Sequence, residues 1–179
     1  MKLTPTPGQT VGPFFGYALP FPHDNELVAP DAPGAVLLHG RVLDGHGEPV
    51  PDAILELWQA DADGNVVQEQ GSLHREAAPF TGFGRASTDA DGHYGFTTLT
   101  PGAPFFAVTV FARGLLNRLF TRAYLPGASD ALLESLDPAR CSTLLTTRDE
   151  TGPMTAYLFD VHLQGERETV FLTYPRHEA

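Results

Sequence analysis

Seven histidines are the side chains best able to bind a metal or move a proton in this chain of 179 residues. No two of them are spaced as H-x-H, H-x-x-H or H-x-x-x-H, so no local histidine pair for zinc or iron is predicted. Histidines distant in sequence can still converge, but each one taken singly is interpreted as a surface or turn residue. They are His23, His39, His46, His74, His93, His162 and His177.

Two D-A-D-G segments, residues 61–64 and 89–92, resemble the start of a calcium-binding loop. An EF-hand loop also needs a third acidic ligand before its glycine and a bidentate glutamate at the twelfth position. Both segments lack that glutamate, and strands rather than helices are expected on either side. We therefore interpret both as turns.

Nucleophile and phosphate-binding motifs are absent from the sequence. There is no G-x-S-x-G, no G-x-G-x-x-G and no Walker motif. Cys141 is the only cysteine, which excludes an intrachain disulfide, and Arg140 is its only cationic neighbour in sequence. Motif by motif, the chain does not read as a self-sufficient enzyme.

The elements that must position these side chains are mostly strands. A proline-rich stretch over residues 1–33 predicts an extended N-terminal arm, followed by one domain over residues 34–179. A long loop is expected over 65–82, a hairpin around the second D-A-D-G turn, and one short helix over 129–136 with Ser129 as its N-cap. Short strands separated by Gly and Pro turns favour an all-β sandwich. Strands are predicted over 35–44, 53–60, on both sides of the turn within 84–99, and over 105–112, 116–125, 156–165 and 168–174.

Composition and charge limit the function classes. The chain has 11 basic and 22 acidic residues, a formal net charge of −11, and this argues against nucleic-acid binding. Hydrophobic residues make up 42%, enough for a core. The N-terminal sequence lacks the apolar run of a signal peptide, and no apolar stretch is long enough for a membrane span, so a cytoplasmic protein is expected. Lys2 is the only lysine, and either carboxylate recognition or a high-GC genome would explain the preference for arginine.

Long segments of the chain resemble the intradiol ring-cleavage dioxygenases. Within that family the sequence is most similar to the alpha subunits of two-chain members, which cleave protocatechuate. The resemblance implies a prealbumin-like β-sandwich and a hetero-oligomeric non-haem Fe(III) enzyme. The segments that carry it are TPGQTVGPFF (6–15), GRVLDGHGEPVPDAILELWQADADG (40–64), GFGRASTDADGHYGFTTLTPG (82–102), FARGLLNRLFTRAYL (111–125) and YLFDVHLQGERETVF (157–171).

The family's iron is held by two tyrosines and by two histidines of an H-x-H motif. Phe105 and Ala107 stand at the matching histidine positions, and neither side chain can coordinate a metal. No tyrosine occurs between Tyr17 and Tyr94, and the segment that would carry the second tyrosine is too short. The resemblance therefore implies that this chain binds no iron and that Fe(III) is bound by a partner beta subunit.

The residues carried over from the family line a substrate pocket shared with that partner. Arg113 matches an arginine that would bind the substrate carboxylate, and a structural salt bridge is its alternative role. Arg85 and Arg122 are expected to pair with acids. The arm residues that would line the partner's pocket are Thr10, Gly12, Pro13 and Phe14.

Two further interpretations follow from the same sequence. The pattern of residues 40–102 also occurs in prealbumin-like binding or spacer modules, although such modules usually end near that point and are exported. A homo-oligomeric dioxygenase that uses its own iron conflicts with the missing ligands. Trp58 and Phe96 are interpreted as core residues.

Overall fold

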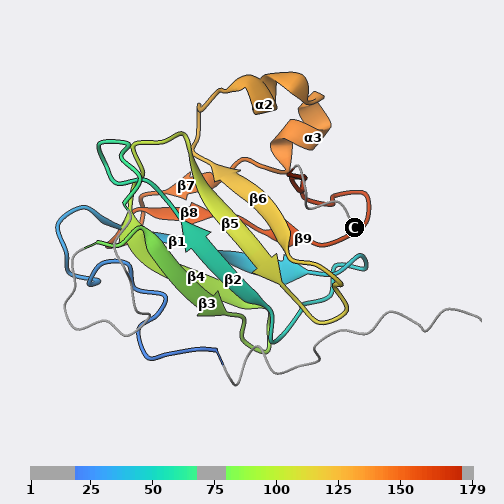
Figure 1. The fold of residues 1–179 in the computed structure, drawn as a ribbon, viewed down its shortest axis with the longest axis horizontal. Helices are drawn as coiled ribbons and strands as arrows, with labels where there is room; N and C mark the ends of the chain where they lie inside the picture. The colour runs from blue at the N-terminus through green and yellow to red at the C-terminus, as the bar shows by residue number, and fades with distance from the viewer. Residues whose placement is uncertain (1–18, 68–79, 175–179) are drawn as a thin grey trace, which may run out of the picture.

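The computed structural model describes residues 19–67 and 80–174, which form two β-sheets and two short helices (Figure 1). Sheet I contains β4, β1, β8 and β7 in that order, with β9 also paired to β1, and sheet II has the order β3-β2-β5-β6. The strands are β1 (Ala35–Leu43), β2 (Ile54–Trp58), β3 (Phe83–Ser87), β4 (His93–Leu99), β5 (Phe105–Phe111), β6 (Leu119–Tyr124), β7 (Thr147–Asp149), β8 (Ala156–Leu158) and β9 (Val161–His162); the helices are α2 (Ala131–Ser135) and α3 (Pro138–Ser142).

The core lies between the two sheets. Side chains alternate between the faces of a strand, so every second residue of β5 is buried while its neighbours face outward. Phe96 of sheet I and Phe106 of sheet II are both fully buried in one cluster, together with residues of β1 and β2. Two sheets packed over a shared apolar core are the arrangement that alternation predicts.

The predicted hairpin around residues 89–92 is wrong. β3 pairs with β2 in sheet II, whereas β4 pairs with β1 in sheet I, so the turn carries the chain from one sheet to the other. The turn itself is as expected: the Asp89 carboxylate accepts hydrogen bonds from the backbone N–H groups of Asp91 and His93. Turn chemistry specifies the reversal of the chain but not which sheet the outgoing strand joins.

The predicted single helix is replaced by two. Asp130, rather than Ser129, is the N-cap of α2, because its carboxylate accepts from the N–H groups of Leu132 and Leu133. Asp137 caps α3, which has a proline in its first turn. The sequence pattern missed α3 because five residues are too few to show helical periodicity.

The last two predicted strands are also shorter than expected. The strand over 156–165 is divided into β8 and β9. The backbone of Phe159, between them, lies so close to Gly40 that a Cβ on Gly40 would be 2.0 Å from the Phe159 carbonyl oxygen. Residues 168–174 contain no named strand, only a bridge between Leu172 and Phe120.

Residues 24–28 lie across the open edges of both sheets. The Arg85 N–H of β3 donates to the Asp24 oxygen, and the Leu27 N–H donates to the Thr97 oxygen of β4. Leu27 is almost fully buried in the core. This segment therefore satisfies backbone groups that two edge strands would otherwise expose.

No helix within the described residues is long and apolar enough to cross a membrane.

Candidate functional site

The outer face of sheet II carries Phe105 and Ala107, the two positions expected to correspond to metal-binding histidines. In the strand registers Trp58 lies opposite both Phe83 and Ala107, and Ala107 lies opposite Arg122. Side-chain alternation points these residues away from the core. They form a row across β3, β2, β5 and β6, and Phe105 lies next to it on β5.

Phe105 and Ala107 do not fit an iron ion. The Phe105 ring packs edge-on against Tyr124, with centroids 5.3 Å apart, and the Arg122 guanidinium carbon lies 4.1 Å from the Phe105 ring centroid. A phenyl ring and a methyl group offer no donor atom to Fe(III), which prefers phenolate, carboxylate and imidazole donors. The permanent positive charge of Arg122 also disfavours a nearby cation.

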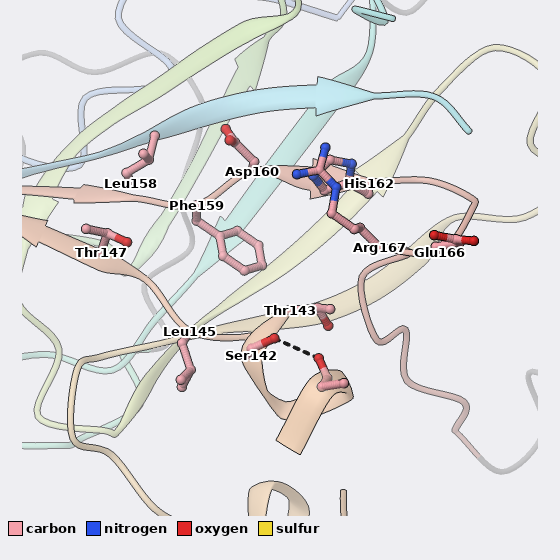
Figure 2. Close-up of a pocket in the computed structure, with 11 residues that line it drawn as sticks. Ser142, Thr143, Leu145, Thr147, Leu158, Phe159, Asp160, His162, Glu166 and Arg167 are labelled. Carbon is pink, nitrogen blue, oxygen red and sulfur yellow. Dashed lines mark hydrogen bonds between the residues drawn. The ribbon is translucent and has the colours of Figure 1, made fainter. Parts of the chain in front are cut away.

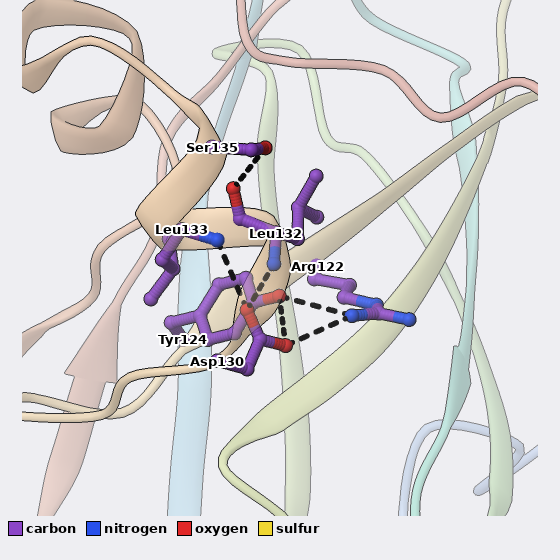
Figure 3. Close-up of polar contacts among 6 residues, drawn as sticks. All are labelled: Arg122, Tyr124, Asp130, Leu132, Leu133 and Ser135. Carbon is purple, nitrogen blue, oxygen red and sulfur yellow. Dashed lines mark hydrogen bonds and ion pairs between the residues drawn. The ribbon is translucent and has the colours of Figure 1, made fainter.

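Tyr124 is engaged in a polar network and is not a spare phenolate ligand (Figure 3). Its hydroxyl donates to Asp130 Oδ2 at 2.8 Å, and Arg122 Nη1 donates to the same hydroxyl and to the same carboxylate oxygen. Burial raises the pKa of Tyr124; the hydrogen bond from Arg122 opposes this rise and Asp130 adds to it. The Tyr124 hydroxyl is thus committed to contacts with Asp130 and Arg122.

Arg85 and Arg122 both pair with acids, as predicted. Arg85 contacts the Glu56 carboxylate through Nε and Nη2, and Arg122 contacts Asp130 at 3.1 Å. Both pairs are partly buried on sheet II. They fix side chains on the outer face of sheet II.

Trp58 is not a core residue, contrary to the prediction. Its side chain is 51% exposed and its ring packs on Phe83, with centroids 4.5 Å apart. Trp58 ends β2 on the outward-facing side, whereas Phe96 is fully buried as predicted. Alternation along β2, which buries Leu55 and Leu57, would have placed Trp58 outside.

Arg113 lies directly after β5, at the opposite end of that strand from Phe105. Its Nη2 donates to Asp52 Oδ2 at 2.9 Å, and its side chain is 56% exposed. Arg113 therefore makes a salt bridge and still faces solvent. The other predicted site residues, Thr10, Gly12, Pro13 and Phe14, lie outside the described residues.

One group of possible metal ligands occurs in the described part of the chain: Asp89, Asp91 and His93, all exposed. Their contacts are those of a turn, since Asp89 accepts backbone hydrogen bonds and the His93 Nε2 faces the Arg41 Nε at 2.8 Å. The histidines within 19–67 and 80–174 do not converge on a shared site. The Asp61 carboxylate accepts the same kind of backbone hydrogen bonds, from Asp63 and Asn65, so both D-A-D-G segments are turns.

Comparison with known proteins identifies the family. Residues 11–128, which include β1 to β6, match a family model described as a dioxygenase. The chain belongs to this dioxygenase family.

The dioxygenase chain is 39% identical to the protocatechuate 3,4-dioxygenase alpha chain of Pseudomonas putida, over 96% of this chain and 98% of that protein. It is 34% identical to the protocatechuate 3,4-dioxygenase beta chain of Burkholderia cepacia, over 75% of this chain and 66% of that protein. The dioxygenase domain of a dioxygenase carbohydrate-binding protein fusion from Streptomyces sp. SirexAA-E has the same fold, with a TM-score of 0.59 and 29% identity, covering 90% of this chain and 99% of that one. The predicted all-β fold with two sheets is thereby confirmed.

A cavity of about 410 Å³ lies between α3 and the strands β7, β8 and β9 of the dioxygenase chain (Figure 2). Asp160, His162, Glu166 and Arg167 line it together with apolar side chains such as Phe159. Burial lowers the pKa of His162, with a further contribution from Arg167, so its imidazole is neutral at pH 7. Among the predicted positions that the structure describes, Phe105, Ala107 and Arg113 do not line this cavity.

Proposed function

We propose that this chain is the alpha subunit of a protocatechuate 3,4-dioxygenase. In this reaction O₂ cleaves the ring between the two hydroxyl-bearing carbons, and one oxygen atom enters each new carboxylate of 3-carboxy-cis,cis-muconate. The observation that carries the proposal is the 39% identity to an alpha chain along nearly the whole length of both proteins. That length also disfavours a binding or spacer module, whose resemblance is confined to residues 40–102.

Iron in this assembly is bound by the partner beta subunit. Support for this part of the proposal comes from sheet II, where Phe105 and Ala107 provide no donor and Arg122 places a positive charge beside them. The relatives of this protein include both an alpha chain and a beta chain of protocatechuate 3,4-dioxygenase. Iron held there would supply the activation of the substrate, and this chain would contribute pocket wall and substrate recognition.

Arg113 is proposed to bind the substrate carboxylate at the interface with the beta subunit. Its guanidinium is permanently charged, is more than half exposed, and can meet a carboxylate with paired hydrogen bonds. The proposal assigns the N-terminal arm, residues 1–33, to the same pocket through Thr10, Gly12, Pro13 and Phe14. The domain over 34–179 then carries Arg113, in a cytoplasmic enzyme.

The overall charge makes a local cation necessary. With a formal net charge of −11, the field of this chain repels an anionic substrate, so attraction must come from individual arginines placed at the pocket. Arg85 and Arg122 are both partly buried in ion pairs. Arg113 is more exposed than either and is the better candidate.

Reconstitution tests the proposed function. The chain, its cognate beta chain and the co-expressed pair are assayed for protocatechuate-dependent O₂ uptake under identical conditions. We expect full activity only from the pair and none from this chain alone. Ring cleavage by this chain alone, or a co-expressed beta chain whose activity and KM do not depend on this chain, would contradict the proposal.

A further inference from the structure

Asp52 and Arg113 are brought together by the pairing of β2 with β5. Ile54 lies opposite Phe111 at the end of the ladder, and the same register continued by two residues places Asp52 opposite Arg113. The contact between Asp52 and Arg113 thus lies just beyond the end of this ladder, next to the buried residues Ala53 and Ala112. The register of two strands therefore fixes this pair, although 61 residues separate its members.

The contact leaves most of the guanidinium available. Asp52 Oδ2 accepts a hydrogen bond from Arg113 Nη2 at 2.9 Å. Within the described residues, the other nitrogens of the guanidinium have no hydrogen-bond partner. The Asp52 side chain is 25% exposed and that of Arg113 is 56% exposed. Because the guanidinium is a rigid planar fork, holding one nitrogen restricts the direction in which the other donors point.

Asp52 lies in a turn and has a positive φ. Its φ is 59°, in the left-handed region that glycine adopts most easily and that asparagine and aspartate adopt more often than other residues. The conformation is fixed on one side by Ala53, whose N–H donates to Thr88 Oγ1 at 2.8 Å and whose oxygen accepts from the Thr88 N–H at 2.9 Å. The position of the Asp52 carboxylate is therefore set by a turn that is anchored to β3 and its following loop through Thr88.

The carboxylate is also costly to place there. Asp52 Oδ1 is buried and has no hydrogen-bond partner in the structure. A partly exposed ion pair contributes little to folding, since water screens it and two long side chains must be ordered. The buried, unpaired oxygen and the exposed ion pair thus give folding little gain from an aspartate here.

We infer that Asp52 is a positioning residue, which orients the Arg113 guanidinium toward the carboxylate of the substrate. The inference rests on the proposed function of Arg113. Asp52 does not touch the substrate in this arrangement. It holds Nη2 from behind, so that the remaining donors of Arg113 face the pocket already aligned, and less rotational freedom is lost when the substrate binds.

The test uses the co-expressed alpha–beta complex carrying Asp52→Asn, which keeps the size of the side chain and tolerates the positive φ. The KM for protocatechuate is expected to rise about fivefold with kcat nearly unchanged, because a charge-assisted hydrogen bond is lost from the ground state. The KM for catechol, which lacks the carboxylate, should not change. Glu150→Gln, which breaks the exposed Arg148–Glu150 pair on β7, is the matched control and should leave both KM values unchanged.

A second variant separates positioning from a structural role. Asp52→Gly removes the carboxylate and also relieves the positive φ, so the melting temperature of the complex should be equal or higher. The KM for protocatechuate should nevertheless rise as it does in Asp52→Asn. A lower melting temperature with an unchanged KM would assign Asp52 to stability and overturn the inference.

The Arg113→Ala background distinguishes this inference from the proposed function. Arg113→Ala should raise the KM for protocatechuate more than for catechol, and Asp52→Asn should add nothing to it. If Arg113→Ala is selective but Asp52→Asn is silent, the inference is wrong and the proposed function stands. Equal effects of Arg113→Ala on both substrates would remove Arg113 from carboxylate binding and the inference with it, and additive effects would show that Asp52 acts independently of Arg113.

Discussion

At the scale of single residues, a cluster of aromatic and polar contacts orders one end of the outer face of sheet II. Phe105, one of the proposed vestigial ligand positions, packs between Tyr124 and Arg122. Asp130 pairs with the Arg122 guanidinium and accepts a hydrogen bond from the Tyr124 hydroxyl. These contacts connect β5, β6 and the start of α2.

Asp130 caps α2 and also binds Tyr124 and Arg122, so its replacement should lower the free energy of unfolding. Asp130→Ala deletes the N-cap of α2 and leaves the Tyr124 hydroxyl and Arg122 without their carboxylate. We expect a loss of about 2 kcal/mol in the free energy of unfolding, measured by urea denaturation.

The neighbouring Ser129→Ala is the control for that variant. Ser129 makes an exposed hydrogen bond to Glu134 and does not cap the helix, so its replacement should change stability by less than about 0.5 kcal/mol. Equal losses in the two variants would contradict the assignment of Asp130 as the cap.

The sequence indicated part of this cluster and missed the rest. Phe105 and Arg122 were marked by the family resemblance, and the need of Arg122 for an acidic partner follows from its charge. The identity of that partner could not be predicted, because it depends on how the turn after β6 brings Asp130 back to the sheet. Ser129 and Asp130 are adjacent in sequence and both are residue types suited to an N-cap, so the sequence alone did not show that Asp130 takes this position.

At the scale of elements, the turn at 89–92 decides the architecture because it joins the two sheets. Gly92 has φ +75°, and a Cβ there would lie 2.8 Å from the Val42 oxygen of β1. The turn is thus fitted closely against sheet I. A side chain at this position would both strain the backbone and separate the turn from β1.

Gly92→Ala should therefore destabilise the chain more than Gly127→Ala. Gly127 has nearly the same φ, +77°, but a Cβ there would meet nothing within 4 Å. The control variant should lose about 1 kcal/mol from backbone strain alone, and Gly92→Ala should lose more, as measured by urea denaturation. Equal losses would show that the close approach to Val42 carries no energy.

Most strands were predictable because alternation is a local property. β1, β2, β5 and β6 lie within their predicted ranges, and their inward-facing residues form the core. The pairing of β3 and β4 was not predictable from the turn, since a hairpin and a connection between sheets use the same residues. The exposed position of Trp58 could have been predicted from the alternation along β2. The prediction of a core position was wrong because it was made from residue type rather than from that alternation.

At the scale of the whole molecule, an acidic chain is assigned to the binding of an acidic substrate. With a net charge of −11, the proposed recognition depends on one oriented cation, Arg113, rather than on a positive surface. Phe105 begins β5 and Arg113 follows the other end of that strand, so the proposed carboxylate-binding residue and the proposed vestigial ligand position lie at opposite ends of β5. In the proposed assembly, the chain contributes its shape and one charged side chain.

Iron content of the separated chains tests the central claim most directly. This chain and the co-expressed alpha–beta complex are purified from iron-supplemented cultures, and iron and visible absorption are measured for each. The account predicts that the complex contains iron and shows the tyrosinate-to-iron colour, and that this chain alone contains neither iron nor colour. Stoichiometric iron with that colour in the chain alone would contradict it.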